Sequence, residues 1–321
     1  MTVRSDRKTS WRNATVARID PGVYNIMATP FDESGELDLA SLGTLIEFQL
    51  ARGVAGLTIL GNLGEVRYLT DAERATVVDA TMTRVAGRVP VIVGMGFSGA
   101  HATASHARGA EAAGAAGLIV APPVGVRGQD AIVDHYSRVG EATPLPIVIY
   151  DEPVSSAVIM PPGTLARIVE AVPTASVIKL EDPPTPVKLT QLRRLLGNRA
   201  QIFGGLGGAF FLEELARGAD GTMTGFAFSE VLVAIYQRFA EGSGEDAREI
   251  FERYLPLIRY EAQPGIGLAV RKELLRRRGA IRTSVLRPPA QPLDRDTLAE
   301  LDATLAAAGL ARQEALSVTI R

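Results

Sequence analysis

Apolar and polar stretches alternate regularly along the chain from Val23 onward. Short apolar runs rich in Val, Ile and Leu indicate strands, and each is followed by a longer segment whose apolar residues recur at helical spacing. We expect strands at 24–30, 56–60, 89–93, 118–121, 147–150, 177–179, 201–203 and 221–224, and helices at 38–52, 70–86, 100–113, 130–141, 162–171, 186–196, 208–217 and 229–241. Because the runs are continuously apolar, they predict a parallel sheet buried on both faces.

This repeat predicts an α/β fold, a TIM (β/α)8 barrel, since eight β/α units in roughly 220 residues are typical of one. A doubly wound sheet shares the alternation and is the alternative. After Gly244 the pattern is helical only, at about 246–260, 266–278 and 294–308. We therefore expect a loose extension over 1–22, the barrel over 23–243 and a C-terminal helical subdomain over 244–321.

Composition removes several classes of function. The 321-residue chain contains no cysteine, which excludes disulfides, thiolate catalysis and Cys-ligated zinc. It has only three histidines, and His101 and His106 do not match the i, i+4 spacing of helical metal ligands, so we expect no metal and no cofactor.

Charge and hydropathy set further limits. A net charge of −2 gives no reason to expect nucleic acid as a partner. No apolar run reaches the roughly 18 residues of a membrane span. The first residues lack the apolar segment of a secretory signal, so we expect a soluble, cytoplasmic protein.

Gly94-Met95-Gly96-Phe97-Ser98-Gly99 matches the G-x-G-x-x-G pattern of dinucleotide-binding loops, between a strand and a helix. However, it lies in the third β/α unit rather than the first. The strand that follows it also ends without the carboxylate that binds the ribose. NAD binding is therefore not predicted.

The active site of a TIM barrel lies where the strands end, and two chemically capable side chains stand there. Lys179 ends the sixth predicted strand and Tyr150 the fifth, so both can face one pocket. A lone lysine at such a position is usually a solvated cation, but a desolvated amine can attack a carbonyl and form a Schiff base. A tyrosine there can be a packed aromatic or a proton donor.

Four acidic residues also follow strand ends: Asp151, Glu152, Glu181 and Asp182. Two or three of them are expected to be solvated or to cap the next helices. Any that point inward can hydrogen-bond substrate hydroxyls. They can also hold Mg²⁺, which leaves a metal-dependent lyase as a minority alternative.

Several motifs in a fixed order resemble the dihydrodipicolinate synthase / N-acetylneuraminate lyase family. They are Thr29-Pro30-Phe31, the Gly61-x-x-Gly64-Glu65 loop, Tyr150 with a proline three residues on, and Ile178-Lys179. The resemblance covers nearly the whole chain. It implies Schiff-base chemistry on 2-keto acids, usually without a metal, in a homo-oligomeric barrel, here a dimer or tetramer.

By the same resemblance, Lys179 is the Schiff-base lysine and Tyr150 the proton-shuttling tyrosine. Gly61-Asn62-Leu63-Gly64 corresponds to the loop that binds the substrate carboxylate, where backbone N–H groups can hold an anion. Glu65 is expected to brace that loop. Gly205 and Met223 are expected to line the pocket, although Met223 could also be plain core.

Three positions depart from the family pattern. Asn62 and Leu63 stand where hydroxyl residues, typically Thr, are usual, so the carboxylate depends more on main-chain donors. Pro123-Val124 replaces a tyrosine pair that contributes to the proton relay. Ser155, with no arginine nearby, stands where the synthases hold the carboxylate of the second substrate with an arginine.

We therefore expect a lyase, an aldolase or a dehydratase, that forms a Schiff base with a 2-keto acid such as a 2-keto-3-deoxy sugar acid. One alternative is a synthase-like condensation of pyruvate with an aldehyde. Another is a catalytically weak barrel that acts as a 2-keto-acid-binding protein or a regulatory protein. The sequence leaves the substrate and the direction of the reaction open.

Overall fold

Eight parallel strands close into a barrel in chain order in this computed structural model, which describes residues 18–96 and 98–310. The strands are β1 Gly22–Ile26, β2 Gly56–Ile59, β3 Val91–Gly94, β4 Gly117–Val120, β5 Ile147–Asp151, β6 Val177–Leu180, β7 Gln201–Gly204 and β8 Gly221–Thr224. β1 pairs with β8, which completes the ring. The predicted TIM barrel is confirmed, and the doubly wound alternative is wrong.

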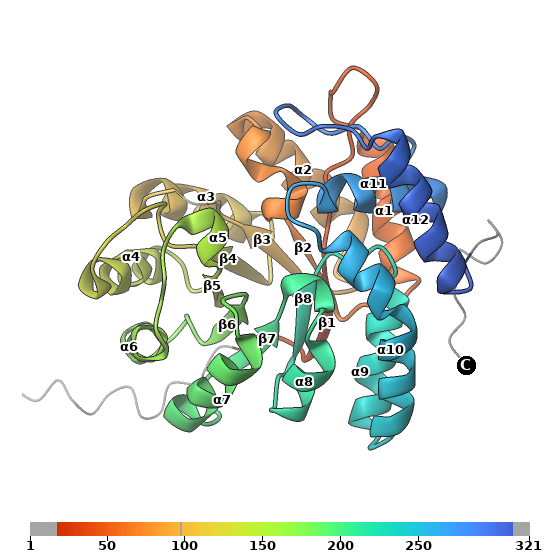
Figure 1. The fold of residues 1–321 in the computed structure, drawn as a ribbon. Helices are drawn as coiled ribbons and strands as arrows, with labels where there is room; N and C mark the ends of the chain where they lie inside the picture. The colour runs from red at the N-terminus through yellow and green to blue at the C-terminus, as the bar shows by residue number, and fades with distance from the viewer. Residues whose placement is uncertain (1–17, 97, 311–321) are drawn as a thin grey trace, which may run out of the picture.

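Helices cover the outside of the barrel (Figure 1). They are α1 Leu39–Leu50, α2 Asp71–Val85, α3 Ala100–Ala112, α4 Gln129–Ala142, α6 Pro162–Ala171, α7 Thr185–Leu196, α8 Phe211–Ala216 and α9 Ser229–Ala240. Each predicted helix is confirmed. Short turns are added at the strand ends: α5 Pro153–Ser156 and the 3-10 turns η2 Asn62–Gly64, η3 Val66–Tyr68 and η4 Leu206–Gly208.

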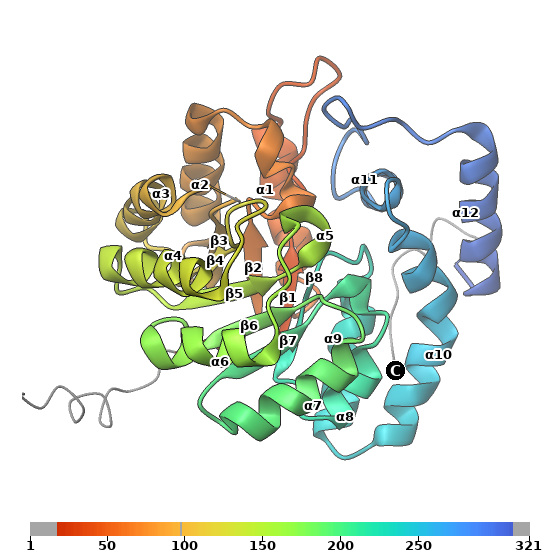
Figure 2. The same ribbon diagram turned by 60° about the vertical axis from the view of Figure 1, so that its left-hand side comes forward.

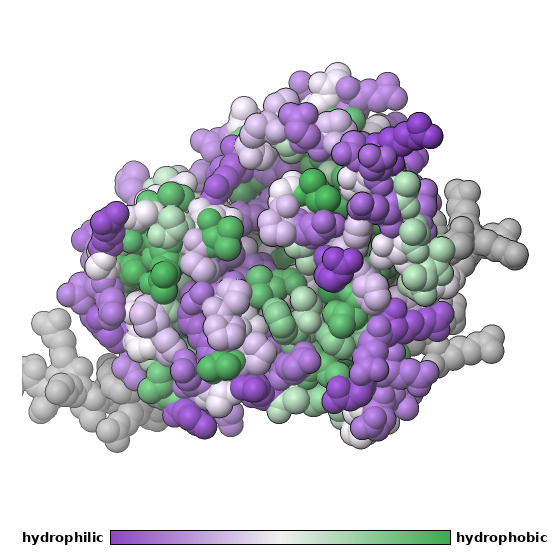
Figure 3. Space-filling view, viewed as in Figure 1, coloured by the Kyte–Doolittle hydropathy of each residue, from purple (hydrophilic) through white to green (hydrophobic). Residues whose placement is uncertain are grey.

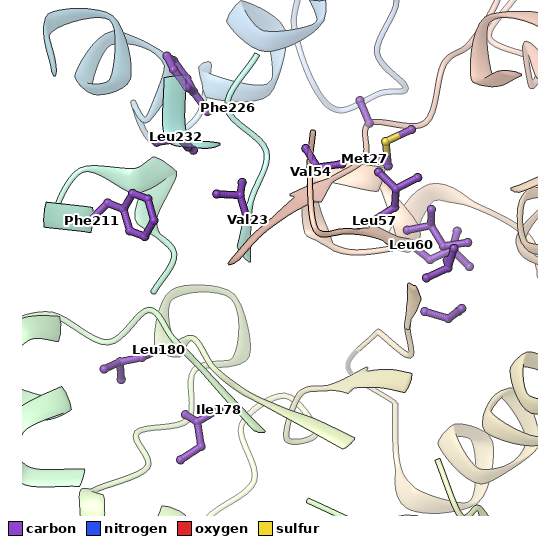
Figure 4. Packing of buried hydrophobic residues seen from close by; sticks show 14 of the residues in the cluster. Val23, Met27, Val54, Leu57, Leu60, Ile178, Leu180, Phe211, Phe226 and Leu232 are labelled. Atoms are coloured by element: carbon purple, nitrogen blue, oxygen red, sulfur yellow. The ribbon is translucent and has the colours of Figure 1, made fainter. Parts of the chain in front are cut away.

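Alternation along each strand creates two separate apolar cores. Residues such as Val23, Leu57 and Ile178 point outward and pack between the sheet and the helices (Figure 4). Their neighbours point inward and fill the barrel, among them Tyr24, Ile119 and Phe203. Lys179 lies between the outward-facing Ile178 and Leu180 on β6, so the same alternation directs its side chain inward.

Three helices, α10 Gly244–Glu261, α11 Gly267–Arg277 and α12 Arg295–Ala307, follow the barrel and gather on one side of it (Figures 1 and 2). α10 packs against α9. Buried ion pairs join these helices to the barrel: Arg278 contacts Glu230 of α9, and Lys272 contacts Glu65. The described part of the C-terminal region is therefore helical as expected, whereas the limits of the three regions stay a prediction, and most of the extension lies outside the described residues.

The face of the molecule seen in Figure 3 is mostly hydrophilic and has several separate hydrophobic patches. Within residues 18–96 and 98–310, the structure contains no helix that is long and apolar enough to cross a membrane.

Candidate active site

Lys179 and Tyr150 lie side by side at the carboxyl end of the barrel. They are paired in the register of β5 and β6, and both are buried. The Lys179 Nζ atom lies 4.3 Å from the centre of the Tyr150 ring. Burial raises the pKa of the Tyr150 hydroxyl well above its usual value, and Glu181 and Glu152 raise it further. Tyr150 is therefore a proton donor at neutral pH rather than a phenolate.

Glu181 connects these two groups. One of its carboxylate oxygens, Oε2, lies 3.1 Å from Lys179 Nζ, and Tyr150 hydrogen-bonds to the same side chain. The other oxygen, Oε1, accepts a hydrogen bond of 2.8 Å from the Leu206 backbone N–H. Gly205 makes this arrangement possible, since a Cβ atom there would lie 2.2 Å from Glu181 Oε1. A lysine, a carboxylate and a tyrosine thus form one buried, connected cluster.

The Gly61–Gly64 loop lies on the far side of Tyr150. Asn62 Nδ2 is 3.4 Å from the Tyr150 hydroxyl and 3.1 Å from Ser155 Oγ, so the amide bridges the two. The loop forms the 3-10 turn η2, whose first backbone N–H groups have no partner within the turn and can bind an anion. Leu63 packs against the core inside the barrel.

Glu65 fixes this loop from behind. Its fully buried carboxylate receives hydrogen bonds from Lys272 of α11 and from the Arg287 backbone N–H. At Gly64, the backbone carbonyl accepts a hydrogen bond of 2.6 Å from the Thr29 hydroxyl. The expectation that Glu65 braces the loop is confirmed.

The other acidic residues at the strand ends have structural contacts. Glu152 accepts hydrogen bonds from the Ser155 N–H and caps α5. Asp151 and Asp182 both pair with Lys188, at 2.6 and 2.7 Å. Burial raises the pKa of Asp151 to about 6, although Lys188 opposes the shift. Among the residues that the structure describes, no three His, Asp or Glu side chains are arranged to hold a metal ion.

A cavity of about 20 Å³ lies between these groups. That volume holds roughly one water molecule. Of the predicted site residues, Lys179, Tyr150, Gly61, Asn62 and Leu63 line the cavity. Gly64 and Gly205 do not line it but support its walls, and Met223 is fully buried in the core inside the barrel.

Some residues at the cavity could not be singled out from local motifs. Thr58, Ile26 and Ile119 line it from strand interiors, and Gly94 and Gly96 belong to the loop that matched a dinucleotide motif. The inward parity of each strand residue was the signal that could have found the first three.

No arginine stands near Ser155 along the chain, but the fold brings one there from another loop. Arg67 Nη2 donates a hydrogen bond of 2.9 Å to the Ser155 backbone carbonyl. Arg67 belongs to η3, far from Ser155 along the chain, so only the closing of the barrel brings the two together. A guanidinium is therefore present on this side of the site.

Comparisons with known proteins agree with this geometry. A model of the dihydrodipicolinate synthetase family matches residues 21–308. The chain is 34% identical over 285 residues to an L-2-keto-3-deoxyarabonate dehydratase of Azospirillum brasilense, covering 87% of this chain and 92% of the relative. It is also 34% identical over 287 residues to a 4-hydroxy-tetrahydrodipicolinate synthase of Sorangium cellulosum, covering 87% and 94%.

Solved structures show the same fold. A dihydrodipicolinate synthase from Rhodopseudomonas palustris superposes with a TM-score of 0.86 at 35% identity, covering 90% of this chain and all of that one. A putative dihydrodipicolinate synthetase from Pseudomonas aeruginosa gives 0.85 at 31% identity, covering 90% and 99%. From the matched residues, the shared barrel and the lysine and tyrosine at its strand ends, the chain belongs to the dihydrodipicolinate synthetase family.

Proposed function

We propose that the protein is a lyase that forms a Schiff base with a hydroxylated 2-keto acid and dehydrates it, with a 2-keto-3-deoxy sugar acid as the substrate class. The observation that carries the proposal is the contact of Lys179 with Glu181, which also hydrogen-bonds Tyr150. The similarity to a 2-keto-3-deoxyarabonate dehydratase supports it. Lys179 is the nucleophile, and Tyr150 and Glu181 are the proton carriers.

The first step joins the enzyme to its substrate. Glu181 accepts a proton from the Lys179 ammonium, and the free amine attacks the C2 carbonyl. Tyr150 donates a proton to the developing alkoxide and takes one back from the nitrogen. Glu181 returns its proton to the carbinolamine hydroxyl, which leaves as water and gives the iminium ion. The backbone N–H groups of the Gly61–Leu63 turn hold the C1 carboxylate meanwhile.

The second step removes the hydroxyl at C4. A base takes a proton from C3, and the two electrons of the C–H bond move into the iminium to give an enamine. The enamine electrons then expel the C4 hydroxyl, which leaves as water after it receives a proton. Glu181 suits the base because it lies beside the iminium nitrogen, and Tyr150 suits the acid because it is protonated at neutral pH and hydrogen-bonds to Glu181.

Borohydride trapping tests this proposal. Incubation with pyruvate or with a 2-keto-3-deoxy sugar acid, followed by reduction, is expected to add the mass of the reduced ligand to Lys179. Lys179→Ala should fold and bind no label, while Lys188→Ala, which removes a buried lysine that pairs with aspartates, should still be labelled. Absence of any adduct on the wild-type protein would contradict the mechanism.

Condensation of pyruvate with an aldehyde is a second candidate, favoured by Arg67 beside Ser155. A guanidinium there can hold the carboxylate of a second substrate. One assay of substrate consumption distinguishes the two reactions. A synthase consumes pyruvate only when an aldehyde is present, whereas a dehydratase converts a single 2-keto acid and releases no pyruvate.

A third candidate is a barrel that binds 2-keto acids without turnover. It is favoured by the half-buried Leu63 and by Pro123-Val124, which replace residues usual at the family's site. Saturable adduct formation without product across a panel of 2-keto acids would identify it.

We also propose that the chain forms a homo-oligomer. Val124, Val154 and Ile159 are 58, 83 and 70% exposed. They lie in two neighbouring segments, since the Gly125 N–H donates to the Ser156 carbonyl at 2.9 Å. An apolar surface of this kind is typical of a contact between subunits.

A further inference from the structure

Thr58 of β2 carries a buried hydroxyl that makes no hydrogen bond to any other described residue. The residue is fully buried, and within the described residues its Oγ1 atom has no hydrogen-bond partner. A buried polar group without a partner costs free energy, so it is usually satisfied by water or a ligand. Thr58 lines the same cavity as Lys179 and Tyr150.

The strand register places Thr58 in one layer with Lys179. Thr58 pairs with Ile92, which pairs with Gly117. The stagger of a TIM barrel is roughly one residue per strand. Across two strands this adds two residues to Gly117, so the residue at the same height as Thr58 is Ile119. Repeating this two-strand count leads from Ile119 to Lys179, then to Met223, and then back to Thr58. These four residues form one layer. Thr58 and Lys179 are therefore on opposite strands of one four-residue layer inside the barrel.

The next layer above them contains two glycines. By the same register it consists of Ile26, Gly94, Tyr150 and Gly205, two of which have no side chain. Neither glycine can be replaced in place, since a Cβ atom at Gly94 would lie 2.1 Å from the Leu60 carbonyl oxygen and one at Gly205 would meet Glu181. The two glycines thus let the Leu60 backbone and the Glu181 side chain approach closely above the Thr58 and Lys179 layer.

We propose that the Thr58 hydroxyl donates a hydrogen bond to the carboxylate of the 2-keto acid bound to Lys179, an inference that rests on the proposed function. The carboxylate carbon is bonded to the carbon that Lys179 attacks, so it lies next to Lys179, which lines the same cavity as Thr58. Thr58 is on the strand that runs directly into the Gly61–Leu63 turn, which places its hydroxyl below the same carboxylate.

The surrounding chemistry leaves few other partners for this hydroxyl. Its neighbours in the cavity include Ile26, Leu60 and Ile119, which are apolar. Leu63, on the turn, supplies no hydroxyl to the substrate. A carboxylate only accepts hydrogen bonds, and a buried hydroxyl with an unused proton is a suitable donor to it.

Thr58→Val tests the proposal, since valine keeps the shape and removes the hydroxyl. We measure how the borohydride-trapped fraction of Lys179 depends on the concentration of pyruvate and of methyl pyruvate, whose ester is uncharged. The concentration of pyruvate for half labelling should rise about tenfold or more, because a hydrogen bond to a charged group is lost. For methyl pyruvate it should rise less than about threefold, because the bond to a neutral acceptor is weaker.

Thr222→Val is the matched control. Thr222 is also fully buried with an unpartnered hydroxyl in the described chain, but it follows the outward parity of β8 and lies outside the cavity. It should leave labelling by both ligands unchanged. Thr58→Ser should restore pyruvate labelling, and the melting temperature of Thr58→Val should equal or exceed that of the wild type.

Two outcomes overturn the inference while the proposed function stands. One is an unchanged pyruvate dependence in Thr58→Val. The other is an equal loss for pyruvate and methyl pyruvate, which would assign Thr58 to the support of Lys179 rather than to the carboxylate. A wild-type protein that forms no adduct with either ligand would instead refute the proposed function, and this inference with it.

Discussion

Glu181 acquires its place in the site from the alternation of β6. Lys179 points inward, Leu180 points outward into the helix layer, and Glu181, just past the strand end, returns to the inside. Asp182, one residue on, pairs with Lys188 instead. The sequence identified Lys179 and Tyr150 from their places at strand ends and from the family resemblance, and it left the four acidic residues open. The alternation of inward-facing and outward-facing residues along β6 would have predicted that Glu181, but not Asp182, faces the inside of the barrel.

Glu181→Gln should lower turnover sharply, and Lys179 should form its adduct more slowly, because no carboxylate takes the ammonium proton. The amide keeps the size of the side chain but cannot accept the C3 proton, and loss of a general base typically costs about 10²–10⁴-fold in rate. Steady-state kinetics with a 2-keto-3-deoxy sugar acid, run beside borohydride trapping, measures both effects. Asp182→Asn is the control, and turnover that falls equally in both variants would contradict a chemical role for Glu181.

Glu214 of α8 should make the folded state less stable as pH rises. Its buried carboxyl accepts a hydrogen bond of 2.6 Å from the Thr185 hydroxyl, and burial raises its pKa from 4.5 to about 8. Below about pH 4.5 both the folded and the unfolded chain hold the proton. Between about 4.5 and about 8 the unfolded chain ionises first, so stability present at low pH is lost.

Glu214→Gln removes this titration. Its free energy of unfolding, relative to the wild type, should increase from pH 5 to pH 8 by on the order of 2 kcal/mol. Urea unfolding followed by circular dichroism at several pH values measures the difference. Glu213→Gln, at the exposed neighbouring position, should show no such trend. A constant difference between Glu214→Gln and wild type across this range would show that Glu214 ionises normally.

At the scale of elements, the Gly61–Gly64 turn depends on a helix far from it in sequence. Lys272 of α11 meets Glu65 in a fully buried ion pair, and Lys272 also donates to the Val285 carbonyl at 2.8 Å. Burial lowers the pKa of Lys272, while Glu65 acts in the opposite direction. The turn is therefore held by the C-terminal region rather than by its own strand.

Lys272→Met should destabilise the protein and weaken ligand binding together. Removal of one partner leaves a buried charge unpaired, which typically costs about 3–5 kcal/mol. Chemical unfolding gives the stability, and the pyruvate concentration for half labelling of Lys179 gives the binding. The double variant Glu65→Gln/Lys272→Met should recover part of the stability, since no charge stays unpaired. A double variant as unstable as the single one would indicate a packing role instead.

The long elements were predictable because each buries a repeated apolar pattern, as Leu42, Leu45 and Ile46 do on α1. The short ones were not. α5 spans only Pro153–Ser156, too few residues for a helical period to show. η2 and η3 are likewise set by the closing of the barrel and by Glu65, not by a local pattern.

At the scale of the molecule, the sequence placed a subdomain boundary near Gly244 because strands stop there. The structure shows contacts across that boundary: Glu261 accepts from the Ala227 N–H at 3.0 Å, and Arg278 pairs with Glu230. Such pairs join residues far apart in the chain, so no periodicity reveals them. The same holds for Arg67 beside Ser155. Local patterns predict which elements form, whereas the contacts that complete the site depend on barrel closure.

The exposed apolar residues beside the site should decide the oligomeric state. Val154 is the most exposed large apolar residue of the described chain and belongs to α5, next to the Ser155 contact with Asn62. Val154→Asp would place a charge in an apolar contact between copies, which costs several kcal/mol if it stays buried. We expect the variant to have a smaller mass than the wild type by size-exclusion chromatography with light scattering at equal concentration.

Val187→Asp is the matched control for that experiment, because Val187 is also exposed, at 46%, and belongs to α7, a helix that lies apart from α5 (Figures 1 and 2). It should leave the mass unchanged. If α5 lies in a contact between subunits, Val154→Asp should also weaken pyruvate labelling of Lys179, since Ser155 follows it and bonds to Asn62 in the cavity wall. A wild-type protein with the mass of one chain, or a Val154→Asp variant with an unchanged mass, would contradict an assembly through this surface.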